Sequence, residues 1–484
     1  MKIALVQCPS YSVDTPPLGI AYLCAVLKKE GYSLKVFDFN AELYDKYKEY
    51  WKPEKEWSWY ANKFFLEKSE FEILTDSFAG EILNFCPDAI GFSVQSTSAV
   101  FSLRVADKIR QRDKSKIIIF GGPECFREKA ETFLNNSELN FVISGEGEET
   151  LVELLRVIKT GSSLSACNGL TFYSGGKIIC NAPRKEIEDL NFLPYPDFSF
   201  FTPGKYLHKG TLPMLSSRGC INRCTFCLDT WYQYKYRSRE PENVVGEIEY
   251  LIEKHGVKYI RFNDLLLNGN LEKLEKMCDL LIKKNASYVS WVGNAVARDM
   301  NKKLLKKMRR AGCVRLIFGI ESCSSKILGL MRKNTKVEEI SSLLKKSANA
   351  GIEVVTNWIV GFPGETREDF METIRFILAH QRYIFSSGSA NILSILPRSI
   401  IAKDLEKFNV EFGKDLQTEW LCRDNNISER RHRQRIFNKF LVNLGILDND
   451  DNGREHQSFF RNIILSVKRG KILNEIKKEL YANT

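Results

Sequence analysis

The chain has 484 residues, of which 44% are apolar and 27% are charged, and its net charge is +11. This length exceeds one ordinary domain, and the composition is that of a globular protein with buried cores, which excludes a disordered or fibrous chain. Apolar runs fall short of the roughly eighteen residues that a membrane-spanning helix needs. The start, MKIALVQCPS, lacks the length and cleavage site of a signal peptide. We therefore expect a cytoplasmic protein without a transmembrane segment.

Short β-branched runs alternate with helical patterns over residues 1–160. The strand candidates are KIALVQ (2–7), LKVFDFN (34–40), PDAIGFSV (87–94), KIIIFGG (116–122) and the start of FVISGEGEE (141–149). This order predicts a parallel sheet with helices on both faces, which is a Rossmann-like α/β domain. Ligands of such sheets bind at the carboxyl ends of the strands. The loops expected there are rich in Gly, Pro, Ser and Thr, so they are a candidate binding site.

The rest of the chain divides into three parts. Residues 161–209 are expected to be a linker, in which GLTFYSGGKIIC has the pattern of a β-hairpin. Residues 210–400 contain six further strand–helix units, which predict a partial (β/α)6 barrel with its active site at the carboxyl ends of the strands. Residues 401–484 are charged and mostly helical, and we expect them to be associated with the substrate.

Part of the positive charge is concentrated in ERRHRQR (429–435) and in the last twenty residues. Such runs usually form a solvated helix face. A negatively charged partner, such as nucleic acid, a membrane surface or an acidic peptide, is the minority interpretation. We therefore expect no nucleic-acid partner.

Three of the 13 cysteines, Cys220, Cys224 and Cys227, lie within eight residues in RGCINRCTFC, directly after the first strand of the expected barrel. The other ten are scattered singly, which is typical of buried thiols in a reducing compartment. A structural zinc site usually takes four ligands, and the nearest histidines are His208 and His255. An iron–sulfur cubane held by three thiolates leaves one iron open to bind and polarise a small molecule. The spacing therefore favours an iron–sulfur cluster over zinc.

This C-x3-C-x2-C motif, with an aromatic residue before its last cysteine, resembles that of the radical S-adenosylmethionine enzymes. Other segments resemble later strands of that family in the same order: IRFNDLLLN (260–268), NAVARD (294–299), VRLIFGIES (314–322) and NWIVGFPGET (357–366). The resemblance implies that Cys220, Cys224 and Cys227 are the catalytic metal ligands of a [4Fe–4S] cluster. The residues that it implies near S-adenosylmethionine are Phe226, Asn263, Asp264, Arg298, Glu321, Ser322, Asn357 and Gly361.

Each of these segments also has an ordinary structural interpretation. GFPGE is a turn in most proteins, Glu321 could cap a helix, and Arg298 could form a surface ion pair. One departure from the family pattern follows the last barrel strand, where many relatives have P-x-P-G-T and this chain has ILPRSII (395–401).

The resemblance implies a definite chemistry. In the family, the amino group and carboxylate of S-adenosylmethionine bind the open iron, and one electron from the cluster cleaves the S–C5′ bond. The resulting 5′-deoxyadenosyl radical abstracts hydrogen from an unactivated position, while the protein supplies position and shielding. This chemistry implies an external one-electron reductant of the flavodoxin or ferredoxin type.

The first domain resembles the cobalamin-binding module that precedes the barrel in one branch of the same superfamily. DTPPLG (14–19) lies where other cobalamin proteins have D-x-H-x-x-G, so Pro16 stands in place of the histidine below cobalt. Gln95 replaces a leucine, and Glu124 replaces a histidine that many relatives carry. The residues that the resemblance implies near cobalamin are Pro16, Gly19, Ser93, Gln95, Gly121, Gly122, Gly145 and Glu146. A flavodoxin-like domain with another ligand is the alternative, and dinucleotide binding is disfavoured because no G-x-G-x-x-G follows the first strand.

These features predict a cobalamin-dependent radical S-adenosylmethionine enzyme. We expect methylation of an unactivated carbon of a small-molecule, lipid or peptide substrate, because a proline below cobalt should favour methyl transfer. A cyclisation or rearrangement without methyl transfer is the first alternative. A non-catalytic cobalamin or iron–sulfur protein is the second, although electron carriers usually close their clusters with four ligands.

Overall fold

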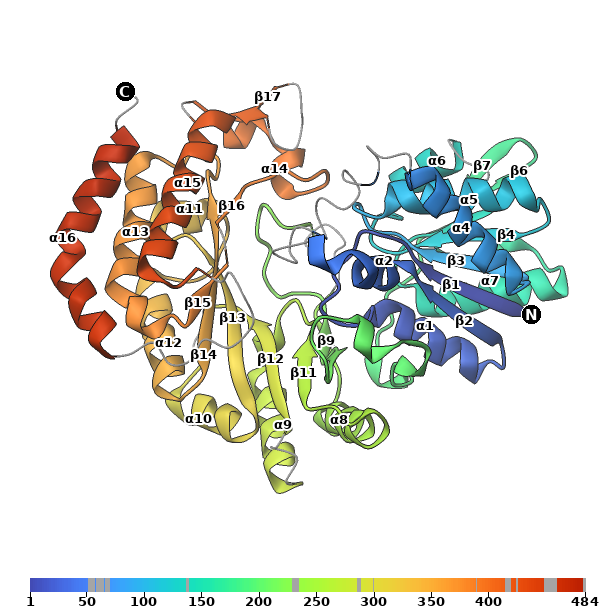
Figure 1. Ribbon diagram of the computed structural model, residues 1–484, viewed down its shortest axis with the longest axis horizontal. Coiled ribbons are helices and arrows are strands. Elements are labelled where there is room, and N and C mark those ends of the chain that lie inside the picture. Colours follow the sequence, from blue (N-terminus) through green and yellow to red (C-terminus); the bar gives the residue numbers. More distant parts are fainter. Residues whose placement is uncertain are drawn as a thin grey trace. The chain divides into compact units, whose positions relative to one another are not determined.

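The computed structural model describes residues 1–50, 57, 65, 70–135, 139–228, 235–284, 289–298, 300–388, 390–413, 419–423, 425–447 and 459–481. These residues fold into two compact units, Met1–Pro213 and Met214–Thr484 (Figure 1). Both units combine parallel strands with helices, as the sequence predicts. All of the expected site residues lie within the described ranges.

The first unit is built on one sheet, whose strand order is β2-β1-β3-β4-β5-β6-β7. Pairing is parallel from β2 through β5, and β6 and β7 are antiparallel. The strands are β1 (Lys2–Gln7), β2 (Ser33–Asp38), β3 (Ala89–Ser93), β4 (Ile117–Gly121), β5 (Phe141–Ile143), β6 (Leu170–Ser174) and β7 (Lys177–Cys180). The chain order reverses between β1 and β3, which places the expected ligand crevice of a doubly wound sheet at these two strand ends.

The helices of this unit cover a sheet whose central strands are buried. They are α1 (Leu18–Lys29), α2 (Phe39–Tyr47), α4 (Glu70–Asn84), α5 (Ala99–Arg112), α6 (Arg127–Asn135) and α7 (Gly147–Thr160). An aromatic core lies on one side, where the Phe39 and Phe78 rings stack with centroids 4.0 Å apart. Strand β4 is apolar and largely buried, as expected for a parallel strand covered on both faces.

The hairpin expected in the linker is part of the first sheet. Strand β6 pairs with β5, so the hairpin extends the sheet edge. The remaining linker residues fold onto the same unit. The Tyr206 hydroxyl donates to Asp38 Oδ2 at 2.5 Å, and Lys28 pairs with Asp197 at 2.7 Å. The first unit therefore extends to Pro213, beyond the expected boundary at residue 160.

The second unit contains a sheet of consecutive strands in the order β15-β14-β13-β12-β11-β8, with β16 also paired to β14. The strands are β8 (Thr211–Met214), β11 (Tyr259–Phe262), β12 (Ser290–Ala295), β13 (Cys313–Glu321), β14 (Glu353–Val360), β15 (Ser386–Ser387) and β16 (Asn391–Ile392). Pairing from β11 to β15 is parallel. Each strand therefore lies beside its predecessor in the chain, which is the order of a partial (β/α)6 barrel.

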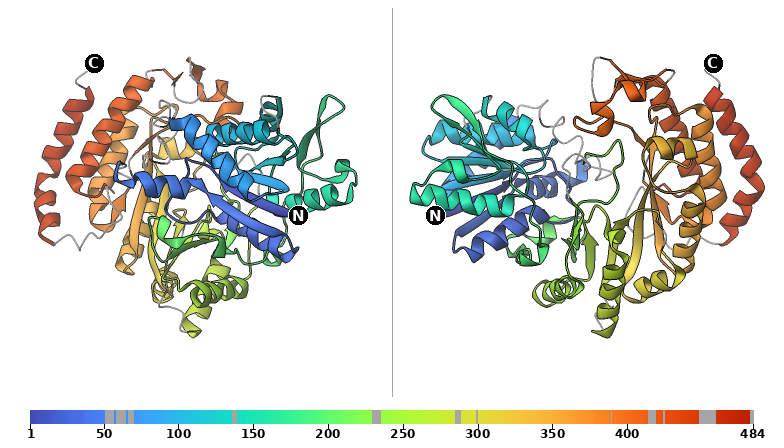
Figure 2. Two further views of the ribbon diagram at one scale, coloured as in Figure 1. Left: turned by 45° about the vertical axis from the view of Figure 1, so that its right-hand side comes forward. Right: turned by 180° about the vertical axis from the view of Figure 1, so that it is seen from behind.

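Helices flank the strands of the second unit, and the last of them packs on two other helices (Figure 2). They are α8 (Pro241–His255), α9 (Leu271–Lys283), α10 (Lys302–Arg310), α11 (Ser325–Leu330), α12 (Val337–Asn349), α13 (Arg367–His380), α14 (Ile400–Lys403), α15 (Ile427–Leu444) and α16 (Phe459–Tyr481). Their starts follow local chemistry: the side chains of Asn270, Asn301 and Asn426 accept from backbone N–H groups at the beginnings of α9, α10 and α15. Among the described residues, every helix is too short or too polar to span a bilayer.

Candidate functional site

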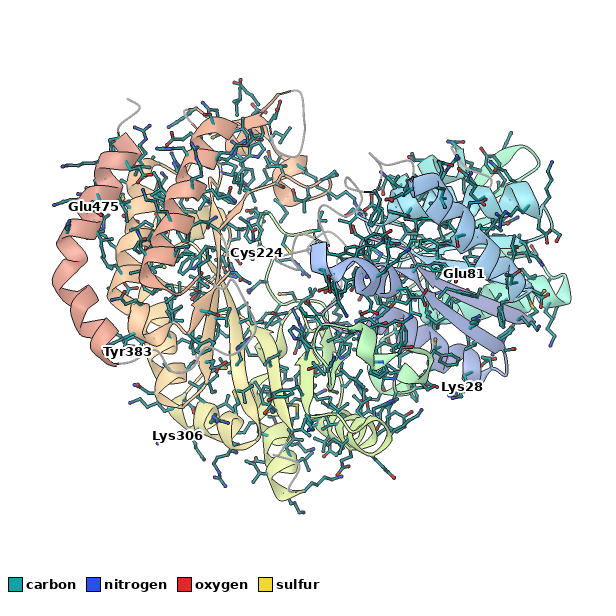
Figure 3. The ribbon with its side chains drawn as sticks, viewed as in Figure 1. Lys28, Glu81, Cys224, Lys306, Tyr383 and Glu475 are labelled. Carbon is teal, nitrogen blue, oxygen red and sulfur yellow. The ribbon has the colours of Figure 1, made fainter. Side chains whose placement is uncertain are left out.

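The three cysteines lie on a loop that two short strands close. Strand β9 (Ser217–Arg218) pairs antiparallel with β10 (Arg237–Ser238), so the chain between them leaves the sheet and returns beside its starting point. Figure 3 labels Cys224 on this loop. Residues 229–234 of the loop lie outside the described part of the chain. The loop begins just after β8, at the end of the strands where the sequence predicts the active site.

Thr225 fixes the middle of this loop. Its side chain is fully buried. Its N–H donates to Met331 O at 3.0 Å, its hydroxyl donates to Leu330 O at 3.1 Å, and its carbonyl accepts from Ile401 N at 3.0 Å. The neighbouring Phe226 packs against an apolar cluster that includes Phe362. Cys224 and Cys227 are thereby held on either side of an anchored dipeptide.

The thiols fit an iron–sulfur cluster better than a single metal ion. Cys224 is 8% exposed, and Cys220 and Cys227 are half-buried. Among the described residues, no three His, Cys, Asp or Glu side chains converge on a common point, as one zinc ion would require. A cubane differs because each thiolate binds a different iron, so the sulfurs stay apart. The backbone N–H of Asn222 also points at Cys220 Sγ at 3.4 Å, a contact that favours a thiolate.

Glu321 ends β13 in an unusual backbone conformation. Its φ is +69°, and the β13–β14 register shifts between Gly319 and Glu321. Lys333 Nζ lies 3.3 Å from Glu321 Oε1 and also donates to the Gly319 carbonyl. Both side chains are largely buried, at 13% exposure for Glu321 and 8% for Lys333. A Cβ at Gly319 would lie 2.6 Å from Glu321 Oε1, so a side chain there would displace the carboxylate. The structure therefore fixes this carboxylate from several sides.

The Glu321–Lys333 pair also lies close to the cysteine loop. Burial raises the pKa of the Cys224 thiol, the Lys333 ammonium opposes that rise, and Glu321 adds to it. Burial likewise raises the pKa of Glu321, and Lys333 lowers it. The sequence interpretation found Glu321 and missed Lys333. No local pattern marks Lys333, since lysine in a loop after a short helix is ordinarily exposed.

Asp264 is held by hydrogen bonds within the second unit. It is fully buried, and its carboxylate accepts from the Ser216 N–H, the Ser216 hydroxyl at 2.8 Å and the Ser217 hydroxyl at 2.5 Å. These bonds join the end of β11 to the start of the cysteine loop. The acceptors of Asp264 are thus directed at the protein itself. The adjacent Asn263 side chain is exposed.

Arg298 lies near an aromatic side chain that the sequence interpretation missed. Its guanidinium donates to Gly269 O at 3.3 Å and is half-buried. The Tyr236 ring covers Gly269 so closely that a Cβ there would lie 2.3 Å from Tyr236 Cζ. Burial raises the pKa of Tyr236, and a hydrogen bond with Ser217 lowers it. Because Tyr236 precedes β10, it lies at the base of the cysteine loop.

Ser322 faces the protein, whereas Asn357 is exposed on β14. The Ser322 hydroxyl accepts from Ser324 N at 3.2 Å and lies 3.4 Å from Thr373 Oγ1 of α13. The Ser322 hydroxyl is therefore hydrogen-bonded within the second unit. Ser322 is thus part of the turn after Glu321.

Gly361 begins a tight loop after β14. Its φ is +79°, and its N–H donates to Glu365 Oε2 at 2.7 Å. Asn425 Nδ2 donates to the Gly361 carbonyl at 3.1 Å. A Cβ at Gly361 would lie 2.4 Å from Arg430 Cγ. Both the backbone conformation and this close approach require glycine.

The basic run 429–435 is not simply a solvated face. Arg430 and Arg433 are buried, at 0% and 3% exposure, whereas Arg431 and Arg435 are exposed. Burial lowers the pKa of Arg430 to about 10. The expected solvated face is therefore correct for only part of the run.

In the first unit, the loops after β1 and β3 meet at the expected crevice. The Thr97 hydroxyl donates to Ser10 O at 2.6 Å, which joins the two loops. Pro16 is buried in the first loop, where its ring offers no ligand atom. Gly19 is exposed on α1, and a Cβ there would meet open space.

Most of the remaining residues expected near cobalamin are held by neighbouring backbone, and Gly145 borders open space. Gly122 has a φ of +109°, and a Cβ there would lie 2.8 Å from Val94 N. Both the backbone conformation and the neighbouring backbone therefore require glycine at this position. Gly121 accepts from Val94 N at 2.7 Å. Ser93 ends β3, and Gln95 N–H donates to Ser98 Oγ at 2.9 Å. Gly145, with φ +91°, borders open space.

The Glu146 carboxylate already has a protein partner, because its Oε2 accepts a hydrogen bond from Ile187 N at 2.7 Å. Two buried polar atoms nearby have no partner among the described residues: Gln7 Oε1 at the end of β1 and Ser144 Oγ after β5. Buried polar atoms are normally paired. Unsatisfied atoms at this sheet edge, together with open glycines, fit a ligand with many amide groups, such as cobalamin.

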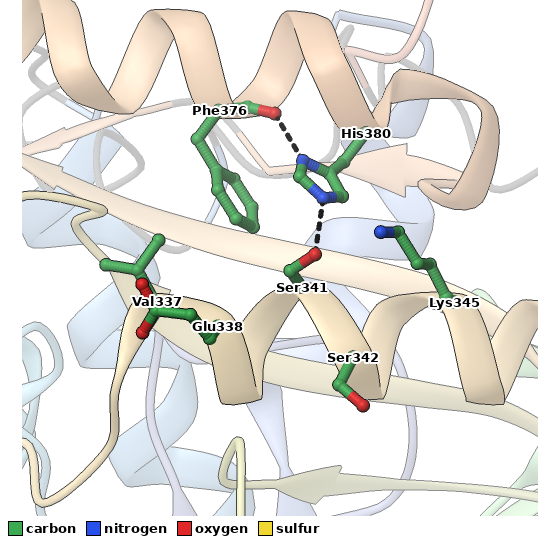
Figure 4. Close-up of a pocket in the computed structure, with 7 residues that line it drawn as sticks. All are labelled: Val337, Glu338, Ser341, Ser342, Lys345, Phe376 and His380. Atoms are coloured by element: carbon green, nitrogen blue, oxygen red, sulfur yellow. Dashed lines mark hydrogen bonds between the residues drawn. The ribbon is translucent and has the colours of Figure 1, made fainter.

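A surface groove of about 460 Å³ lies elsewhere, between α12 and α13 (Figure 4). His380 lines it, with Nε2 2.7 Å from Ser341 Oγ and Nδ1 2.9 Å from Phe376 O. Its ring stacks on Phe376 at 4.1 Å. These groups satisfy one another on the outer helices, and the groove contains no expected site residue.

Comparison with known proteins agrees with this geometry. A family model for the radical SAM superfamily matches residues 214–377, and a B12 binding domain model matches residues 61–155. An uncharacterized methyltransferase of Pyrococcus horikoshii is 28% identical over 78% of this chain and 77% of its own length. An anaerobic magnesium-protoporphyrin IX monomethyl ester cyclase of Cereibacter sphaeroides is 26% identical over 74% of this chain, and the match spans only 56% of the cyclase.

Two solved structures share the fold. The radical S-adenosylmethionine methyltransferase TsrM of Kitasatospora setae, with cobalamin and a [4Fe–4S] cluster bound, has a TM-score of 0.66 at 16% identity and covers 86% of this chain and 81% of its own. The cobalamin-dependent S-adenosylmethionine radical enzyme OxsB, with aqua-cobalamin and S-adenosylmethionine bound, has a TM-score of 0.62 at 19% identity and covers 84% of this chain and 56% of its own. At these identities the likeness concerns the fold alone. With a radical SAM domain built around three cysteines and a B12 binding domain before it, the chain belongs to the cobalamin-dependent radical S-adenosylmethionine enzymes.

Proposed function

We propose that this enzyme methylates an unactivated carbon of its substrate. The observation that carries the proposal is the anchored three-cysteine loop beside the Glu321–Lys333 pair, in a chain that also has a B12 binding domain with Pro16 in place of histidine. A methyltransferase relative of similar length supports methyl transfer. When bound, the cluster and S-adenosylmethionine would supply a hydrogen-abstracting radical, and cobalamin would supply the methyl group.

In the second unit, different residues would hold the cluster and bind S-adenosylmethionine. Cys220, Cys224 and Cys227 would hold the cluster and leave one iron for S-adenosylmethionine. The candidates for binding that cofactor are the side chains of Asn263, Arg298, Glu321 and Asn357, which are fixed or exposed at the strand ends, and the loop that begins at Gly361. Asp264 and Ser322 position the loops that carry them.

The first unit would hold cobalamin at the ends of β1, β3, β4 and β5. Pro16 would lie where other cobalamin proteins place a histidine, and its ring would offer the cofactor no ligand atom. Gly19, Gly145, Gln7 and Ser144 would face the ligand, while Gly122 and Glu146 maintain the loops.

Cyclisation or rearrangement without methyl transfer is the second candidate, and the 26%-identical cyclase favours it. Both candidates need an external one-electron reductant, and we expect a flavodoxin or ferredoxin in the cytoplasm to serve. They differ in their products.

Product analysis separates them. The reconstituted enzyme, supplied with cobalamin, S-adenosylmethionine, a reductant and extracts containing candidate substrates, should form S-adenosylhomocysteine together with 5′-deoxyadenosine. With methyl-labelled S-adenosylmethionine, the label should appear in a product. Substrate-dependent 5′-deoxyadenosine without S-adenosylhomocysteine would establish the cyclase alternative. Binding of both cofactors without either product would indicate a non-catalytic protein.

A further inference from the structure

The C-terminal helix α15 reaches the loop that follows β14. Arg433 Nη1 donates to Glu365 Oε2 at 3.0 Å and to the Glu365 carbonyl at 3.1 Å. Glu365 Oε2 in turn accepts from Gly361 N at 2.7 Å. One side chain of α15 is therefore a single hydrogen-bonded step from the Gly361 backbone.

Arg430, one turn earlier on α15, fixes the other side of this loop. Its guanidinium lies 3.7 Å from the centre of the Trp420 ring and donates to Asn425 O at 2.7 Å. Asn425 Nδ2 donates to the carbonyls of Gly361 at 3.1 Å and Phe362 at 3.0 Å. The aliphatic part of Arg430 occupies the space that a side chain at residue 361 would need. Gly361 is thus enclosed by C-terminal residues.

A second carboxylate, that of Glu429, is shared by Arg433 and Arg367. Glu429 Oε1 accepts from Arg433 Nε at 3.0 Å and from Arg367 Nε at 3.1 Å. Arg367 begins α13, directly after the loop. Both ends of the segment 361–367 are therefore joined to α15 by charged hydrogen bonds.

The burial of these charges indicates what they do. The Arg433 and Glu365 side chains are each 3% exposed. A buried ion pair adds little net stability compared with apolar side chains of the same size. Its hydrogen bonds do impose one geometry on the groups that they join. Leucine-rich packing would have joined α15 to the barrel equally well without fixing Gly361.

We propose that Arg433 and Arg430 are positioning residues for S-adenosylmethionine, acting through the Gly361–Glu365 loop. The inference rests on the proposed function, in which the loop that begins at Gly361 contacts that cofactor. It assigns this part of the C-terminal region to cofactor binding, although the sequence suggested the substrate.

The test measures S-adenosylmethionine binding to the cluster-loaded, full-length enzyme by equilibrium dialysis. Arg433→Gln should raise the Kd by roughly 10-fold or more, as loss of a supporting hydrogen-bonded residue typically does. Arg433→Lys should restore part of the affinity. The matched control is Arg435→Gln, an exposed arginine of the same helix, which should stay within about twofold because exposed charges contribute little. The electron paramagnetic resonance signal of the reduced cluster should be unchanged in each variant until S-adenosylmethionine is added, and the change on addition should be weakened only in Arg433→Gln.

A folded, cluster-loaded Arg433→Gln enzyme with the Kd of the wild type would overturn the inference, as would equal losses in the Arg435→Gln control. If Arg433→Gln does not fold, Glu365→Gln takes its place, since it removes the charge and keeps an acceptor for Gly361 N–H. An unchanged Kd in that variant would also overturn the inference. A wild-type enzyme that carries the cluster and fails to bind S-adenosylmethionine would instead contradict the proposed function.

Discussion

The loops at the strand ends differ between the two units. In the second unit, buried side chains of the protein hold the cysteine loop and its neighbours: Thr225, Asp264 and the Glu321–Lys333 pair each have partners within the unit, whereas Asn425 Oδ1 beside the Gly361 loop has none among the described residues. In the first unit, Gln7 Oε1 and Ser144 Oγ are buried without partners among the described residues, and Gly19 and Gly145 border open space. The second unit is thus already shaped for a small charged ligand. The first keeps unmatched groups for a large one.

The largest expected effect concerns the cysteine loop of the second unit. Cys224→Ala removes a buried thiol from the anchored loop and should abolish cluster binding and S-adenosylmethionine cleavage, because two thiolates cannot hold a site-differentiated cubane. Iron content and the electron paramagnetic resonance spectrum measure this. The control is Cys86→Ala, whose exposed thiol lies in the first unit. Retained cleavage in Cys224→Ala would contradict the cluster assignment.

The next effect concerns how the first unit is held together. Burial raises the pKa of Asp38 to about 6, and the hydrogen bond from Tyr206 opposes that rise. Between pH 4 and 6 the folded state therefore keeps a proton that the unfolded chain has released, so stability should fall as pH rises through this window and level off above it. The fall should total at most about 3 kcal/mol.

The measurement is the pH dependence of the free energy of unfolding of the first unit, from hydrogen exchange of its peptides in urea. Asp38→Asn keeps the cap of α2 and should remove the slope. Asp45→Asn, at a side chain that is 42% exposed, is the control and should keep it. An unchanged slope in Asp38→Asn would show that another group titrates.

A smaller effect examines the ion pair of the second unit. Lys333→Met removes the ammonium that fixes Glu321 and should weaken S-adenosylmethionine binding roughly 10-fold, because a supporting residue is lost. The exposed Lys345→Met variant should bind as the wild type does. Equal affinities in both variants would mean that Glu321 holds its position without Lys333, or that it does not contact the cofactor.

The last prediction concerns the first unit, where Gln7 Oε1 is buried without a partner among the described residues. Gln7→Met removes the unpaired acceptor at nearly constant volume, so the cobalamin-free protein should be at least as stable as the wild type. Cobalamin affinity should fall by about 10-fold if a corrin amide donates to this atom. Titration followed by the visible spectrum of cobalamin measures it. Unchanged affinity, compared with an exposed-site control such as Gln111→Met, would remove Gln7 from the ligand site and weaken the contrast between the units.

Much of the site could be predicted from local sequence. The spacing of Cys220, Cys224 and Cys227 depends on a single loop, and the alternation of strands and helices depends on side-chain periodicity. Gly122 and Gly361 are both expected beside a cofactor, and both have a positive φ, a backbone conformation that favours glycine. Val94 and Arg430, respectively, also fill the space that a side chain at these positions would need, and only the structure shows these neighbours.

Other features depended on contacts between residues far apart in the chain. Asp264 and Ser322 lie in the right segments, yet their hydrogen bonds are made to the protein. Lys333, Tyr236, Arg430 and Arg433 carry no local sign of burial, because a charged or aromatic residue becomes internal only when a distant loop supplies its partners.

The sequence by itself determined the radical SAM and B12 binding domains and the loop that carries the three cysteines, since each depends on residues that are neighbours in the chain. Only the tertiary structure decided that a basic run near the C-terminus encloses Gly361. Periodicity reports which face of a helix is polar, whereas the pairing of Arg433 with Glu365, 68 residues away, exists only once α13 and α15 are packed.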